Sequence, residues 1–258
     1  MRGCEMYHSN KEITRKGVSQ MVQHKLRMDK NHETQKRFNS IKQKILVLAE
    51  EYSQRFSELN EAAEKLICSN QYAKGGMVMH RGYYSPSLLD MVVGGMSRGK
   101  ILPQKPVHYD YSYHFDADGK LICVHKMDGR ILDVEFLQYR GNSVLSFEYA
   151  MWSHPLLHFI SECIYNEENQ MVCYMTALCN GGRDSINITE INVESYRYDN
   201  EGSVIDFSWE RCCCLNGLTN KSIYGFERDR SGNIVAYTVD NCDGREKRRY
   251  STGDGPLS

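Results

Sequence analysis

The C-terminal half of the chain alternates apolar and polar residues in short runs separated by polar turns. In one such run, Ile205, Phe207 and Trp209 are each followed by a polar residue. Successive side chains of a strand point to opposite faces of its sheet, so a period of two predicts a half-buried β-strand. The pattern begins at Val107 and predicts about ten strands in one antiparallel meander. Their expected ranges are 107–115, 120–127, 131–139, 143–151, 156–165, 170–179, 185–198, 203–215, 221–228 and 233–240.

Four related seven-residue phrases mark turns of this meander. They read F-D-A-D-G-K-L from Phe115, Y-N-E-E-N-Q-M from Tyr165, Y-D-N-E-G-S-V from Tyr198 and R-D-R-S-G-N-I from Arg228. The leading Asp or Asn can accept hydrogen bonds from backbone N–H groups further along the turn. The Gly or Asn three residues later tolerates the positive φ that a tight reversal needs. The phrases therefore predict four β-hairpins.

The segment 33–68 has a helical periodicity instead. Its apolar residues recur at steps of three or four, with one additional four-residue step between Tyr52 and Phe56, and neither Pro nor Gly interrupts them. This spacing predicts one amphipathic helix about 54 Å long. We expect it to dock on the sheet or on a short helix at 12–27, with a homodimeric coiled coil as the alternative. The predicted fold class is α+β, with a helical N-terminal segment followed by a large antiparallel sheet of repeated hairpins.

Composition suggests four parts along the chain. They are a helical N-terminal segment at 1–70, a Gly- and Pro-rich connector at 71–107, the sheet domain at 108–244 and a basic C-terminal tail at 245–258. Within the connector, Ser85, Pro86 and Ser87 precede an apolar run, which predicts a capped short helix at 88–93.

Charge is distributed unevenly, although the net charge of the chain is only −1. Residues 1–108 carry 18 Lys and Arg against 10 Asp and Glu, whereas residues 109–244 carry 10 against 21, an excess of 11 negative charges. An acidic sheet favours a basic protein partner and disfavours nucleic acid. The chain has no long apolar run and no apolar leader, so we expect no membrane association. The chain has ten cysteines and no C-x-x-C pair, so we expect reduced thiols in the cytoplasm.

One stretch comes close to a nucleotide-binding motif. Gly94 to Ile101, G-G-M-S-R-G-K-I, nearly matches the phosphate-binding loop. However, Ile101 replaces the hydroxyl that would hold magnesium. Pro103 and Pro106 also exclude the long helix whose N-terminus would bind phosphate. We therefore expect no nucleotide site.

Two groups of residues could be considered as metal ligands. The first is His108, Asp110, His114 and Asp116 on one strand face, and the second is His154, His158 and Cys163. Neighbours on one strand face lie about 6–7 Å apart and need a partner strand to converge. We therefore expect a solvated polar face for the first group and a strand for the second. The run Cys212–Cys214 is interpreted as small apolar residues. No catalytic residue, metal or cofactor is expected. A cavity gathering His108, His114 and acidic residues would instead favour a hydrolase or nuclease.

The hairpin phrases resemble those of a known repeat family. Y-R-Y-D-N-E-G-S-V, H-F-D-A-D-G-K-L and R-D-R-S-G-N-I are similar to the Tyr-Asp (YD, Rhs-type) repeats of bacterial polymorphic toxins. They are also similar to hairpins in the small cytosolic immunity proteins that accompany such toxins. The resemblance implies a hairpin sheet and brings no catalytic residue. Four unevenly spaced units are too few to enclose a toxin.

The functional hypothesis combines the acidic sheet with this resemblance. It is a non-enzymatic immunity protein that occludes a basic toxin domain with an outer acidic sheet face. The alternation places six carboxylates on solvent-facing positions as expected partner contacts: Asp133, Glu135, Glu190, Glu194, Asp206 and Glu210. The alternative is a self-associating scaffold that dimerises through the helix at 33–68.

Overall fold

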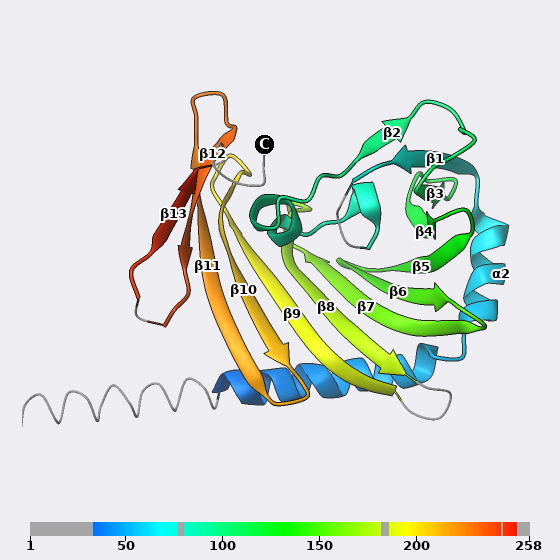
Figure 1. Cartoon of the computed structure of the whole chain (residues 1–258), viewed down its shortest axis with the longest axis horizontal. Helices are drawn as coiled ribbons and strands as arrows, with labels where there is room; N and C mark the ends of the chain where they lie inside the picture. The colour runs from blue at the N-terminus through cyan, green and yellow to red at the C-terminus, as the bar shows by residue number, and fades with distance from the viewer. Residues whose placement is uncertain (1–32, 77–79, 182–185, 244, 252–258) are drawn as a thin grey trace, which may run out of the picture. The chain divides into compact units, whose positions relative to one another are not determined.

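The protein is built around one large antiparallel sheet. The computed structural model describes residues 33–76, 80–181, 186–243 and 245–251 (Figure 1). The chain divides into two units, Met1–Ile41 and Lys42–Ser258, and the described part of the first is helical. The second unit holds 13 strands in the order β13-β12-β11-β10-β9-β8-β7-β6-β5-β4-β3-β1-β2.

The ten-strand meander predicted from the alternation is confirmed. Its strands are β3 (Tyr111–Phe115), β4 (Leu121–Met127), β5 (Ile131–Arg140), β6 (Ser143–Met151), β7 (Pro155–Tyr165), β8 (Met171–Gly181), β9 (Ile186–Tyr198), β10 (Val204–Cys213), β11 (Leu218–Arg228) and β12 (Ile234–Asp240). Three further strands extend it: β1 (Ser69–Lys74), β2 (Lys100–Leu102) and β13 (Arg248–Ser251). β1 lies between β3 and β2, and β13 pairs with β12 at the other edge.

The four predicted hairpin turns share one geometry. In each, a side-chain oxygen of the leading residue accepts a backbone N–H four residues on. These pairs are Asp116 with Lys120 (2.8 Å), Asn166 with Gln170 (2.8 Å), Asp199 with Ser203 (2.8 Å) and Asp229 with Asn233 (2.9 Å). The residue three after the leading one has φ between 59° and 84°, and it is Gly119, Asn169, Gly202 or Gly232. Local turn chemistry therefore sets these reversals.

The prediction of a single amphipathic helix at 33–68 is wrong. The helix ends at residue 52, and α2 (Phe56–Leu66) begins after a turn. The break falls at the additional four-residue step of the apolar stripe. Arg55 bridges it, because its guanidinium lies 2.8 Å from Glu51 and 2.5 Å from Glu58. The predicted α+β class is wrong as well, since the described residues form mainly one large antiparallel sheet.

The break allows aromatic side chains on both sides of it to reach the sheet. Tyr52 stacks on Phe147 with ring centroids 3.7 Å apart. Phe56 packs edge-on against Phe136 and Tyr149, with centroids 5.6 and 5.3 Å away. The hydroxyl of Tyr149 donates to the backbone carbonyl of Tyr52 at 2.6 Å, and that carbonyl at the helix end also accepts the backbone N–H of Arg55 at 3.1 Å. The expected docking of this stripe on the sheet therefore holds for these residues, and a homodimer through 33–68 stays untested.

The opposite face of the sheet is covered by residues 80–99, the described part of the segment between β1 and β2. This segment contains the short helices η1 (Gly82–Tyr84) and η2 (Leu89–Val93), and it lies in the concave side of the curved sheet (Figure 1). Ser87 Oγ accepts the backbone N–H of Asp90, so the predicted serine-capped short helix is confirmed. Because both faces are covered, the central strand β6 is buried along nearly its whole length. Within the described part of the chain, no helix is long and apolar enough to cross a membrane.

Candidate functional site

Arg81 anchors the covering segment to the concave face of the sheet. Its side chain is about 95% buried, and its Nε donates to Glu135 Oε1 at 2.6 Å. Its Nη2 donates to the hydroxyls of Ser146 (3.0 Å) and Ser161 (2.6 Å). Burial opposes the charged guanidinium, but Glu135 and its other polar neighbours hold the pKa of Arg81 well above its ordinary value. The backbone of Arg81 is left-handed (φ 57°), a conformation that the surroundings of a non-glycine residue must enforce.

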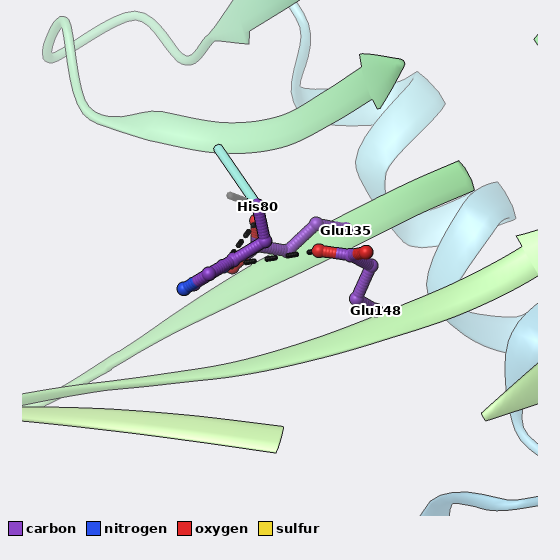
Figure 2. A group of neighbouring side chains, drawn as sticks. All are labelled: His80, Glu135 and Glu148. Carbon is purple, nitrogen blue, oxygen red and sulfur yellow. Dashed lines mark hydrogen bonds and ion pairs between the residues drawn. The ribbon is translucent and has the colours of Figure 1, made fainter. Parts of the chain in front are cut away.

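His80 lies beside Arg81 and contacts two carboxylates. Its Nδ1 is 3.3 Å from Glu135 and 3.8 Å from Glu148 (Figure 2). Its Nε2 bonds the hydroxyl of Tyr174. Burial alone would raise the pKa of Glu135, but the charge of Arg81 and the contacts of His80 outweigh it and hold that pKa below its ordinary value. These contacts hold the covering segment against the sheet, with Arg81 and Glu135 as a buried ion pair.

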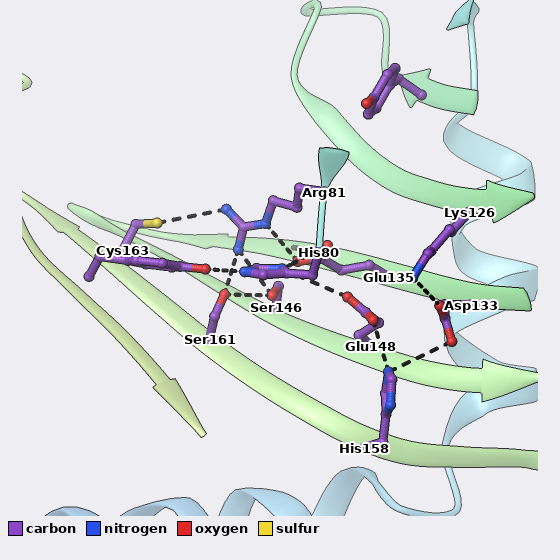
Figure 3. Close-up of polar contacts among 12 residues, drawn as sticks. His80, Arg81, Lys126, Asp133, Glu135, Ser146, Glu148, His158, Ser161 and Cys163 are labelled. Carbon is purple, nitrogen blue, oxygen red and sulfur yellow. Dashed lines mark hydrogen bonds and ion pairs between the residues drawn. The ribbon is translucent and has the colours of Figure 1, made fainter. Parts of the chain in front are cut away.

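A second group lies beside the first on β5, β6 and β7. Glu148 is common to both groups, because its Oε1 is 2.8 Å from His158 Nε2 (Figure 3). His158 Nε2 also lies 3.8 Å from Asp133, whose other oxygen is 3.4 Å from Lys126 Nζ. Burial lowers the pKa of His158, yet the hydrogen bond and charge of Glu148 outweigh burial and leave that pKa raised.

A cavity of about 350 Å³ opens between the covering segment and strands β8, β9 and β10. We call it the acidic cavity because Asp90, Glu190 and Glu194 line it against one guanidinium, that of Arg211. Apolar and aromatic side chains supply most of the remaining wall, with Trp209 among them. A concave apolar site with a few convergent polar groups is the usual form of a ligand pocket.

The three carboxylates of the acidic cavity differ in their partners. Glu190 pairs with Arg211. Glu194 accepts hydrogen bonds from Ser87 Oγ (2.6 Å) and from the backbone N–H of Leu89 (3.1 Å), and burial raises its pKa. The carboxylate of Asp90 makes no hydrogen bond or ion pair with any other described residue. Burial raises the pKa of Asp90, and the nearby His80 opposes that rise.

The structure changes the prediction that six carboxylates face solvent together. Glu135, Glu194 and Glu210 are buried, so their predicted exposure is wrong. Asp206 and Glu210 alternate with Phe207 and Trp209, so they lie on the face opposite to Glu190 and Glu194. The six also have partners within the chain: Lys126 for Asp133, Arg81 for Glu135, Arg211 for Glu190, Ser87 for Glu194, Arg197 for Asp206 and Lys221 for Glu210. They do not form one outer acidic face.

The first group of candidate ligands does not gather into a site. The second group separates, since His158 contacts Glu148 and Asp133 whereas Cys163 accepts from Arg81 at 3.7 Å. Asp116 caps its hairpin turn, and Asp110 accepts a backbone N–H from Gly75. His114 bonds Asn70 and lies beside His125, and its pKa falls to about 4 because it is buried. Lys100, the lysine of the near phosphate loop, begins strand β2 instead of a helix.

Sequence reasoning missed His80, Arg81 and Asp90. They lie in the segment interpreted as a connector, where no periodicity or motif distinguishes them. The left-handed backbone at Arg81 leaves no sequence mark either. The one available signal was Ser87, because a serine cap implied that the next residues form a structured element.

Comparison with known proteins adds little to this site. No protein-family model and no curated protein matches the chain. Among solved structures, one of a Bacteroides fragilis protein of unknown function is weakly similar, with 12% identity and a TM-score of 0.30. The match covers 39% of this chain and 79% of that chain. A likeness this weak carries no argument about function.

Proposed function

We propose that this protein is a non-enzymatic binding protein that receives a cationic side chain of a basic protein partner in the acidic cavity. The observation that carries the proposal is the carboxylate of Asp90. It is half-buried in the wall of the cavity, yet no described residue pairs with it. Partial burial of a carboxylate without a partner is unfavourable, and a lysine or arginine side chain from outside would offset that cost.

The walls of the cavity suit such a guest. Trp209, Tyr174 and Phe159 line it, and aromatic faces attract ammonium and guanidinium groups. Its volume of about 350 Å³ is at the small end of the range for ligand pockets, which suits one long side chain. Glu190 is already paired with Arg211, and Glu194 accepts hydrogen bonds from Ser87 and Leu89, so Asp90 is the carboxylate left for a cationic guest.

Neutralisation of a toxin is the biological role that we propose for this binding. It rests on the resemblance of the hairpin phrases to immunity proteins and on the acidic charge of residues 109–244. The contact set changes, however. We replace the six-residue outer face by the acidic cavity, with Asp90 as the charged contact.

The test is affinity capture from a lysate of the source organism with tagged protein, followed by a salt gradient. We expect one basic protein to be retained and to elute as salt screens the contact. Asp90→Asn should weaken retention at least tenfold. Asp118→Asn makes the same charge change on a hairpin turn, where the side chain is 78% exposed, and should retain the partner. Equal retention by both variants, or no retained protein, would refute the proposal.

A further inference from the structure

The Asp133–Glu148–His158 group lies outside the acidic cavity and has the composition of a metal site. One oxygen of Asp133, one oxygen of Glu148 and one ring nitrogen of His158 all lie within 4.8 Å of one another. Ligands about 2.1 Å from a tetrahedral metal lie about 3.4 Å apart. The separations of 2.8 and 3.8 Å from His158 Nε2 to the two carboxylates bracket that value.

The three ligands converge although they come from three strands. Asp133 and Glu148 lie on the covered concave face, because Glu135 is paired directly with Glu148 in the β5–β6 ladder. The β6–β7 ladder shifts register where Glu148 pairs with Phe159 and the next residue pairs with Leu157. His158 is the additional residue of this bulge. Bulges commonly redirect a side chain, and this one brings His158 to Glu148.

Two cavities adjoin the group. A small, partly open cavity of about 10 Å³ is lined by Asp133 and Glu148 together with Arg81 and Lys126, a volume comparable to the space that one water or ion needs. His158 lines a second pocket, of about 270 Å³, together with Trp152, which is 75% exposed. The two carboxylates therefore border one space and His158 borders the other.

We propose that Asp133, Glu148 and His158 bind one divalent transition-metal ion. An imidazole nitrogen with two carboxylates suits Mn²⁺, Fe²⁺, Co²⁺ or Zn²⁺ better than Ca²⁺, which takes six to eight oxygens. Three protein ligands leave a coordination position for water. Lys126, whose ammonium is 3.4 Å from Asp133, competes with the metal for that carboxylate.

The competing interpretation is an ion pair in which protonated His158 bridges two carboxylates without any metal. Mn²⁺ separates the two interpretations, and it avoids the nine free cysteines of the described chain because it prefers oxygen and nitrogen ligands. The full-length protein is titrated with Mn²⁺, and the six-line electron paramagnetic resonance signal of free Mn²⁺ is followed. We expect loss of that signal with a stoichiometry of one ion per chain.

Four variants make the test specific. His158→Gln and Glu148→Gln should each lower the affinity at least tenfold. His154→Gln, four residues away and hydrogen-bonded to Ser153, should leave it unchanged. Lys126→Met should raise it several-fold, because the competing cation is removed.

Urea unfolding without metal checks that each variant folds. A free Mn²⁺ signal that persists at sub-millimolar wild-type protein would overturn the proposal. Unchanged affinity in a folded His158→Gln variant would overturn it too.

Discussion

The buried ion pair between Arg81 and Glu135 should contribute strongly to stability. Arg81→Met keeps most of the side-chain volume and leaves Glu135 with the ring of His80, 3.3 Å away, as its remaining polar neighbour. Removing one partner of a buried pair costs about 3–5 kcal/mol. Ser146 and Ser161 still bond each other at 2.8 Å, so they add little to this cost.

The assay is urea unfolding followed by circular dichroism. With a denaturant slope of about 3 kcal/mol/M, the midpoint of Arg81→Met should fall by about 1 to 1.7 M. Arg249→Met is the matched control, since Arg249 binds Glu227 in a two-pronged contact at 2.8 and 2.7 Å but the two side chains are 55% and 44% exposed. Its midpoint should not change measurably, because solvent screens the pair.

A double variant tests the cause of the loss. Arg81→Met combined with Glu135→Gln should be more stable than Arg81→Met alone, because no unpaired charge then remains buried. The reasoning is refuted if Arg81→Met shifts the midpoint no more than Arg249→Met. It is also refuted if Glu135→Gln lowers the urea midpoint of the Arg81→Met variant by as much as it lowers the midpoint of the wild type.

Three further predictions concern turns, pH and thiols. Asn169→Gly should raise stability by up to about 1 kcal/mol in urea unfolding, since Asn169 holds φ 59° in a turn whose counterparts use glycine. The raised pKa of Glu194 means that the folded state keeps this proton to higher pH than the unfolded state. The stability that this proton contributes is therefore fully present below pH 4.5, the ordinary pKa of the group, and is lost as pH rises through the raised pKa. Glu194→Gln should therefore lose less stability than the wild type over that pH range. A thiol reagent with mass-spectrometric mapping should label exposed Cys68 and Cys242 in the native state, and Cys123, whose pKa is raised by burial, only after unfolding.

Features set by neighbours in sequence were the ones that could be predicted. The hairpin at 198–204 follows from Asp199 and Gly202, which need only each other and the chain between them. The strand ranges follow from alternation. β1 could not be predicted in this way, because only Ala73 of its six residues is buried and the rest show no period. The helix break at 53–55 was also hidden, because a four-residue step is compatible with an uninterrupted helix.

The candidate site depends on contacts that no local pattern reveals. His80 meets Glu135 55 residues later and Tyr174 94 residues later, and Ser87 meets Glu194 across 107 residues. Alternation showed that Glu135 and Glu194 lie on one face of their strands. It could not show that a loop without periodicity covers that face, so buried carboxylates were taken for exposed ones.

The buried contacts explain why some substitutions in this protein should affect both stability and partner binding, whereas others should affect binding alone. Arg81 and Ser87 hold the covering segment to the sheet, and the acidic cavity exists because the segment stays there. The carboxylate of Asp90 makes no such contact with a described residue, so it does not hold the segment in place and is available to a guest. Arg81→Met should therefore impair both unfolding and capture of a partner, whereas Asp90→Asn should impair capture alone. A segment that only filled the concave face would have no reason to carry an unpaired carboxylate there, and an apolar residue would serve it better.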